Sequence, residues 1–130
     1  VGKIQKGLLI FLGIGKNDDE KIADKVIKKT CNLRIFEDEN QKMNKSIKDI
    51  HGEILIISQF TLYANCKSGN RPSFIEACEP KKANEMYEYF KKTCSKELEK
   101  DIQSGIFGAD MKVELLNDGP VTIILDSEEI

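Results

Sequence analysis

The segment Asn117–Thr122 (NDGPVT) limits the possible folds more than any other part of this chain. It interrupts residues 111–125, whose β-branched and apolar side chains are typical of two short strands. Proline cannot donate to a sheet ladder, so it belongs at a strand's start, at an edge or at a bulge. Gly119 can adopt positive φ, and a Gly-Pro bond can be cis at modest cost. The segment therefore predicts either a plain hairpin turn or a rigid backbone corner that presents carbonyl groups to a ligand.

The most apolar run of the chain, residues 54–64 (ILIISQFTLYA), contains a polar interruption. A buried strand normally continues in Val, Ile and Leu, so the side chains of Ser58 and Gln59 need hydrogen-bond partners. These residues and Thr61 either satisfy backbone groups at the end of a sheet or line the floor of a pocket. The run alone leaves both readings open.

Length and hydrophobic periodicity predict one domain of helices and strands over residues 1–130. We expect an α+β fold in which a mixed, largely antiparallel and barrel-like sheet carries two main helices, although periodicity does not determine how the helices lie on the sheet. A helix is expected over residues 19–31, with Asp18 or Asp19 as its cap, and a longer one over 80–99, opened by Pro80. The expected strands cover residues 7–14, 33–36, 53–63, 102–107, 111–116 and 120–126.

Charge and composition restrict the function classes. The net charge of −2 argues against a protein that coats nucleic acid by bulk electrostatics. The loop at 65–74 has no acid but carries Lys67 and Arg71, a small basic patch that suits a phosphate backbone and is equally common as a plain solvated loop. No apolar run approaches the ~20 residues that span a bilayer, and no signal peptide opens the chain, so we expect no membrane partner and a cytoplasmic location.

The sequence does not match the motifs of several other kinds of functional site. The segment Gly13–Lys16 (GIGK) suggests a nucleotide loop, but Asp18 replaces the third glycine of that pattern. His51 is the only histidine and lies in a polar turn, so no histidine-based triad is expected. The four cysteines form no CxxC pair, which argues against zinc, and only Lys67 is near enough to Cys66 to activate it as a nucleophile.

The chain resembles the D-aminoacyl-tRNA deacylases of the bacterial and eukaryotic type. Two motifs carry most of the resemblance, Ser58–Leu62 (SQFTL) and Asn117–Thr122 (NDGPVT). Three further stretches occur in the family's order and spacing: Asn32–Phe36 (NLRIF), Gly69–Phe74 (GNRPSF) and Phe107–Met111 (FGADM). Each stretch is weak alone, but their common order along nearly the whole chain is highly specific.

The resemblance implies hydrolysis of the ester bond of D-aminoacyl-tRNA, and also of glycyl-tRNA mischarged on tRNA-Ala, without metal or cofactor. The implied catalytic residues are Ser58, Gln59, Phe60 and Thr61. An aminoacyl ester is already activated, so such a site mainly needs to hold the ester and supply donors to the developing oxyanion. Backbone groups around Ser58–Phe60 suit the donor role, and Thr61 suits the holding of a water or carbonyl; Thr61 as covalent nucleophile is disfavoured because no base is visible.

The resemblance further implies a homodimer whose active sites lie at the subunit interface. A cis Gly119–Pro120 unit from the partner chain would enter the pocket and bar an L side chain with rigid backbone. The implied residues for chiral selection are Asn117, Gly119, Pro120, Val121 and Thr122. Phe107 and Met111 would hold the terminal adenine, with ordinary core packing as the alternative, and Lys67 and Arg71 would contact the tRNA.

The chain departs from the family pattern at its beginning. A family member normally starts with a strand about twenty residues ahead of Val1, and the chain has no initiator methionine, so we expect a missing N-terminal segment. That departure favours the alternative of a catalytically inactive RNA- or nucleotide-binding homodimer of the same fold. A purely structural dimerisation domain is a third possibility, but it gives no reason for Ser58-Gln59 or Gly119-Pro120.

Overall fold

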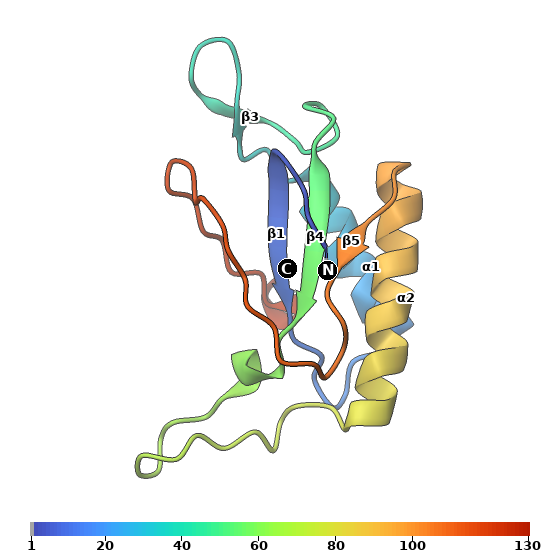
Figure 1. The fold of residues 1–130 in the computed structure, drawn as a ribbon, viewed down its shortest axis with the longest axis vertical. Helices are drawn as coiled ribbons and strands as arrows, with labels where there is room; N and C mark the ends of the chain where they lie inside the picture. The colour runs from blue at the N-terminus through green and yellow to red at the C-terminus, as the bar shows by residue number, and fades with distance from the viewer. Residues whose placement is uncertain (1) are drawn as a thin grey trace.

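The computed structural model describes residues 2–130, and its centre is a three-stranded sheet in the order β1-β4-β5 (Figure 1). β1 (Gly7–Leu12) pairs with β4 (Glu53–Ser58), which pairs with the short β5 (Gln103–Ser104). Both pairings are parallel, with Gly7 opposite Glu53 and Leu55 opposite Gln103. The prediction of a largely antiparallel sheet is therefore wrong here, because each connection between neighbouring strands crosses over through a helix instead of turning back as a hairpin.

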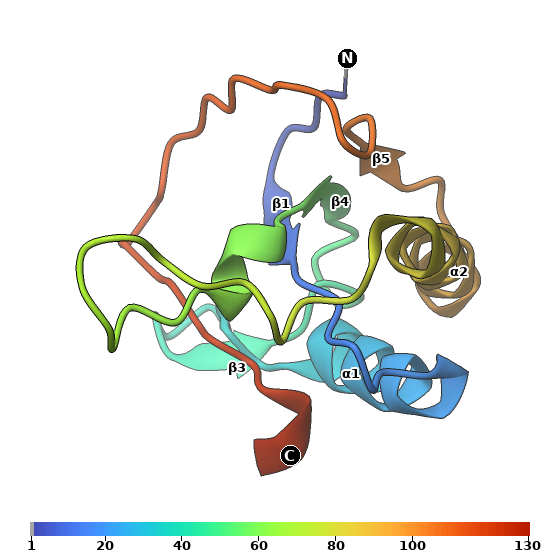
Figure 2. The same ribbon diagram turned by 90° about the horizontal axis from the view of Figure 1, so that it is seen from below.

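Two helices cover one face of this sheet, and Figure 2 shows both on the same side of β1 and β4. α1 (Glu20–Asn32) begins at Asp19, whose carboxylate accepts from the Ile22 backbone N–H. α2 (Pro80–Leu98) begins after Glu79, whose side chain accepts from two N–H groups of the first turn, and it ends at Glu99 in the left-handed region. Both predicted helices are confirmed to within one residue at each end.

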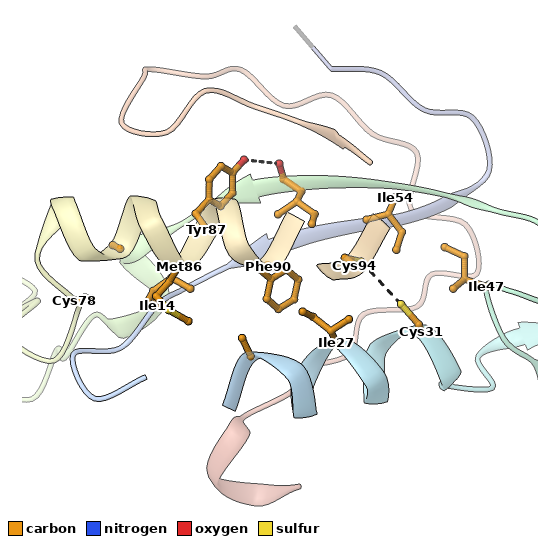
Figure 3. Packing of buried hydrophobic residues seen from close by; sticks show 13 residues of the cluster. Ile14, Ile27, Cys31, Ile47, Ile54, Cys78, Met86, Tyr87, Phe90 and Cys94 are labelled. Carbon is orange, nitrogen blue, oxygen red and sulfur yellow. Dashed lines mark hydrogen bonds between the residues drawn. The ribbon is translucent and has the colours of Figure 1, made fainter. Parts of the chain in front are cut away.

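The hydrophobic core lies between the sheet and these helices (Figure 3). Ile54 and Ile56 of β4 are fully buried against Ile27 of α1 and against Phe90 of α2. The hydroxyl of the buried Tyr87 donates to the Ile56 carbonyl oxygen at 3.0 Å, so its polar end is satisfied inside the core.

Two buried thiols, one on α1 and one on α2, are in contact within this core. The sulfurs of Cys31 and Cys94 are 4.0 Å apart, and both side chains are fully buried. The contact with Cys31 and burial raise the pKa of Cys94, so this thiol stays protonated and behaves as a small core residue. Cys78 is also buried, whereas Cys66 is exposed.

A two-stranded hairpin lies outside this core. β2 (Phe36–Glu37) pairs antiparallel with β3 (Met43–Lys45), so the strand predicted at 33–36 begins only at Phe36. Asp38 accepts backbone bonds from Asn40 and Lys42 and thereby closes the turn.

The C-terminal arm, defined as residues 107–126, is where the sequence prediction fails most. The strands expected at 111–116 and 120–126 are absent, and β5 is the only part of the strand expected at 102–107. The arm extends and turns back without ladder partners among residues 2–130, and Leu116 and Ile124 remain 92% and 90% exposed. β-branched side chains favour extended backbone, but a strand also needs a neighbour to accept its hydrogen bonds. Consequently residues 2–130 form no closed barrel.

The chain ends with the short 3-10 helix η2 (Ser127–Glu129), capped by Asp126. No helix within residues 2–130 is both long and apolar enough to cross a bilayer.

Candidate active site

The candidate catalytic residues lie where β4 leaves the sheet. Ser58 is the last residue of β4 and stands opposite Leu12 of β1. The Gln59 backbone N–H donates to the Leu12 carbonyl at 2.8 Å, which is the last bond that ties this segment to β1. The chain then tightens into the 3-10 helix η1 (Phe60–Tyr63), so the strand predicted to reach residue 63 ends at Ser58.

Two backbone donors at the start of η1 have no acceptor among the residues that the structure describes. The N–H groups of Leu62 and Ala64 donate to Gln59 and Thr61 carbonyls, as the turn requires. Those of Phe60 and Thr61 have no acceptor within residues 2–130, which is the usual state of the first residues of a helical turn. Both residues are exposed, so these donors are available to a ligand.

The side chains of Gln59 and Thr61 form a pair at the same place. The Gln59 Nε2 amide donates to the Thr61 hydroxyl oxygen in a short hydrogen bond. A hydroxyl that accepts in this way keeps its own hydrogen, so Thr61 can donate to a carbonyl oxygen or a water. Ser58, Gln59, Phe60 and Thr61 follow one another at the end of β4 and the start of η1, and their catalytic role stays a prediction.

η1 packs against the segment Gly13–Lys16, which the sequence analysis considered as a nucleotide loop. A Cβ atom placed on Gly15 would stand 2.6 Å from the Tyr63 hydroxyl oxygen, and one on Gly13 would stand 3.2 Å from Leu62 Cβ. The glycines of the failed nucleotide-loop motif thus allow η1 to approach β1 closely. Burial, together with the nearby Asp18 carboxylate, raises the pKa of Tyr63 to about 12. Sequence reasoning missed Tyr63, and the paired glycines were the only signal that could have found it.

The loop after η1 carries the predicted basic residues. Asn65 and Ser73 close its base with two backbone bonds of 2.7 and 2.8 Å, and the rings of Phe60 and Phe74 stack edge to face at 5.0 Å. Lys67 and Arg71 are exposed on this loop, which projects beyond η1 in Figure 1. The loop therefore offers two cations beside the candidate site.

The second motif, Asn117–Thr122, forms an ordered turn at the tip of the C-terminal arm. The Asn117 side chain accepts from the Val121 backbone N–H and donates to the Thr122 hydroxyl oxygen at 3.0 Å. Gly119 has φ +121°, and the Gly119–Pro120 bond is cis, as the family resemblance implies. A rigid corner is thus present at the predicted position.

Within one chain this turn does not meet η1. In Figure 1 the tip of the arm lies toward the end of the molecule where β4 begins, whereas η1 lies beyond the end of β4. The two motifs that the sequence analysis joined in one pocket are therefore apart in a single chain.

The residues predicted for adenine binding belong partly to the core. The Phe107 ring lies 5.9 Å from that of Tyr87 and packs against the buried cluster. Met111 covers Gly105 and is only partly exposed. Both side chains keep an accessible part, so their role in binding stays a prediction.

The remaining candidates for chemistry lie elsewhere. His51 is exposed in a turn at φ 53°, and residues 2–130 contain no group of three potential metal-ligating side chains. Two grooves lie over the helices, one beside Lys91 and Ile102 and the other between α1 and α2, and neither includes a residue of η1.

Comparison with known proteins identifies close relatives. A family model described as D-Tyr-tRNA(Tyr) deacylase matches residues 1–126. A D-aminoacyl-tRNA deacylase of Thermosipho melanesiensis is 53% identical over 130 residues, which is 100% of this chain and 87% of the relative. One of Pseudoalteromonas translucida is 57% identical over 125 residues, covering 96% of this chain and 86% of the relative.

Solved structures resemble the fold. The structure titled "c-Myc DNA Unwinding Element Binding Protein" superposes with a TM-score of 0.86 at 41% identity, covering 95% of this chain and 83% of that one. A second, titled as a probable eukaryotic D-amino acid tRNA deacylase, gives a TM-score of 0.71 over 82% of this chain and 77% of that one. At 14% identity the second match speaks for the fold alone.

Proposed function

Because this chain belongs to the D-Tyr-tRNA(Tyr) deacylase family, we propose that it hydrolyses the ester bond of D-aminoacyl-tRNA and releases the free D-amino acid and the tRNA. The chain is accordingly an ester hydrolase that proofreads charged tRNA. The observation that carries this conclusion is identity above 50% to D-aminoacyl-tRNA deacylases along nearly the whole chain. We also place the protein in the cytoplasm, since translation uses its substrate there.

The geometry at η1 suits an ester that needs little side-chain catalysis. In the proposed mechanism the unpartnered N–H groups of Phe60 and Thr61 donate to the ester carbonyl as it becomes an oxyanion. The Thr61 hydroxyl, oriented by Gln59, holds the attacking water or the carbonyl. The neighbouring 2′-hydroxyl of the ribose helps to deliver the water. Thr61 is a donor here and not a covalent nucleophile, because no base lies beside it.

A complete site in this proposal needs two chains. The Gly119–Pro120 turn of one chain lies far from its own η1, so it would meet the η1 of a partner chain. Exposed apolar side chains support burial by a second copy. They include Phe60 and Leu62 of η1 and Leu116 and Ile124 of the arm. In such a dimer the arms would also gain the partners that a barrel-like β layer requires.

Chiral selection follows from a stiff backbone close to the substrate Cα. The Gly119 and Pro120 carbonyl groups would accept from the substrate ammonium and leave no room for an L side chain. The Asn117 side chain holds this turn through Val121 and Thr122, which gives the exclusion the rigidity it needs. D-amino acids of many sizes fit such a filter, as does glycine, so glycyl-tRNA mischarged on tRNA-Ala is a second expected substrate.

The tRNA end would lie between the loop at 65–73 and the start of the arm. Phe107 and Met111 would hold the terminal adenine by stacking and apolar contact. Lys67 and Arg71 would meet phosphates of the single-stranded end.

Deacylation of D-Tyr-tRNA and L-Tyr-tRNA, followed side by side, tests the proposal. We expect turnover of the D form only. Thr61→Val should lower the rate and Thr61→Ser should largely restore it, because the serine keeps the hydroxyl. A loss on the order of 10⁶-fold in Ser58→Ala or Thr61→Val would indicate a true nucleophile and contradict the donor mechanism. Equal turnover of both enantiomers would exclude the chiral filter.

Mixing two variants of reduced activity tests the two-chain site. A heterodimer of Thr61→Val with Gly119→Ala contains one intact site if the two residues come from different chains. Random assortment at equal amounts then restores about a quarter of the wild-type activity. No recovery after exchange of subunits would place both residues in the same chain's site.

A second candidate function is nucleic-acid binding without hydrolysis. It is favoured by the 41% identity to the structure titled as a DNA unwinding element binding protein. RNA or DNA binding in the absence of any D-Tyr-tRNA turnover would support this alternative.

A further inference from the structure

The groove between α1 and α2 carries unpaired positive charge. It has a volume of about 400 Å³, and its lining includes Lys28 of α1 and Lys92 and Lys96 of α2. All three lysines are exposed, and none has a carboxylate within ion-pair distance among residues 2–130. Three cations thus face one groove without forming an ion pair among residues 2–130.

The acids of the groove are engaged by other groups. The Asp24 carboxylate accepts from the Tyr89 hydroxyl at 2.6 Å. Glu97 accepts from Lys48 at 2.9 Å, and this bond lowers the pKa of Glu97, so the pair stays ionised. Neither carboxylate lies within ion-pair distance of Lys28, Lys92 or Lys96, although the charge of Lys28 also contributes to the lowered pKa of Glu97.

The charge of the two helices differs in sign from that of the rest of the chain. α1 and α2 together contain nine lysines and five carboxylates, a net charge of +4. The whole chain has a net charge of −2, so the residues outside these helices carry −6. An anionic partner is therefore drawn to the helical layer and repelled from most other surfaces.

We propose that this groove binds the phosphodiester backbone of the RNA substrate, away from the ester that is hydrolysed. The inference rests on the proposed function, because it takes the bound polyanion to be the tRNA. Lys92 and Lys96 lie on the same face of α2, one turn and about 6 Å apart, which suits neighbouring phosphates of one strand. Lys28 lines the same groove from α1. These contacts carry no sequence information, so they add affinity for any tRNA.

Binding of uncharged tRNA, measured by fluorescence anisotropy over a series of salt concentrations, tests the groove directly. The variant Lys92→Gln with Lys96→Gln removes two charges. We expect its affinity at low salt to fall about tenfold and its salt slope to decrease by roughly 1.5, as two lost phosphate contacts require. The matched control is Lys42→Glu, which changes the net charge by the same two units at the exposed β2–β3 turn. An equal effect in the control would mean bulk charge and overturn the proposal.

A comparison of two substrates separates this inference from the proposed function. The double variant should raise KM for D-Tyr-tRNA and leave kcat/KM unchanged for D-tyrosyl-adenosine, which has no stem to bind. If the wild-type protein hydrolyses neither substrate, the proposed function fails and the salt slopes alone decide the groove. Wild-type slope and KM in the double variant would overturn the groove proposal while leaving the deacylase function intact.

Discussion

Gly15→Ala is the sharpest test of how η1 is positioned. The added Cβ would stand 2.6 Å from the Tyr63 hydroxyl oxygen and 2.9 Å from Cζ, whereas ordinary contact begins at 3.4 Å. Gly15 is buried and is not among the glycines with positive φ, so the conflict is with the ring and not with the backbone. The ring must therefore retreat by about 0.8 Å, and overpacking of this kind costs about 1–3 kcal/mol of unfolding free energy.

The displacement should also reach the candidate site. Tyr63 ends η1 and Thr61 lies within it, so a shift of the ring moves the Thr61 hydroxyl and the nearby N–H donors. Misplacement by about 1 Å can reduce catalysis by up to 10²-fold, so we expect kcat for D-Tyr-tRNA to fall by roughly 10- to 100-fold. Gly13→Ala is the graded control, because its closest contact is 3.2 Å and requires only a small adjustment.

A double-mutant cycle with Tyr63→Ala, read by urea unfolding, checks the reasoning. Once the ring is removed, Gly15→Ala should be neutral or stabilise by about 0.4–1 kcal/mol, because alanine restricts the unfolded chain. If Gly15→Ala costs the same with and without the ring, Tyr63 is not the obstacle and the account of η1 is wrong.

Three further predictions concern single side chains. Gly119→Ala should destabilise the turn by more than about 1 kcal/mol, since φ is +121° and the added Cβ would stand 2.9 Å from Val121 Cγ2. The same variant should reduce D-Tyr-tRNA turnover, and unchanged turnover would exclude the turn from the site. Tyr87→Phe should lower the unfolding free energy in urea by about 0.5–1.5 kcal/mol, because one hydrogen bond to the Ile56 carbonyl is lost while the Gly105 N–H still donates to it; no measurable loss would contradict this. The pKa of Tyr63 is raised to about 12, so its contribution to stability is complete below pH about 10 and is lost as the pH rises toward 12. In Tyr63→Phe the decline of the unfolding free energy above pH 10 should therefore be shallower than in the wild type. Parallel curves of unfolding free energy against pH would refute this.

The helices were predictable from the sequence because each contains the information for its own position. Apolar residues at three- and four-residue steps mark the buried faces of α1 and α2, and Asp19 and Glu79 fix where the helices begin. The end of β4 was partly predictable, since the polar Ser58 and Gln59 interrupt an apolar run. The 3-10 turn that follows depends on the contact between Tyr63 and a distant glycine, and local propensity does not contain that contact.

The C-terminal arm marks the limit of sequence-based prediction here. Its composition favours strands, but whether a strand forms depends on a partner that lies elsewhere. The cis turn was expected only through family resemblance, and its separation from η1 in one chain was not visible in any local pattern. The parallel direction of β1 and β4 was missed for the same reason, because it follows from how the helical connections pack.

The strand order β1-β4-β5 has a consequence for folding during synthesis on the ribosome. Within residues 2–130 the central sheet contains no hairpin: the partner of Gly7 lies 46 residues further along, and that of Leu55 lies 48 residues further along. At synthesis rates of about 5–20 residues per second, the nascent Gly7–Leu12 segment waits roughly 2–9 seconds before Glu53–Ser58 exists. During that interval the apolar, β-prone Gly7–Leu12 segment lacks its β4 partner and is exposed to neighbouring polypeptides and chaperones.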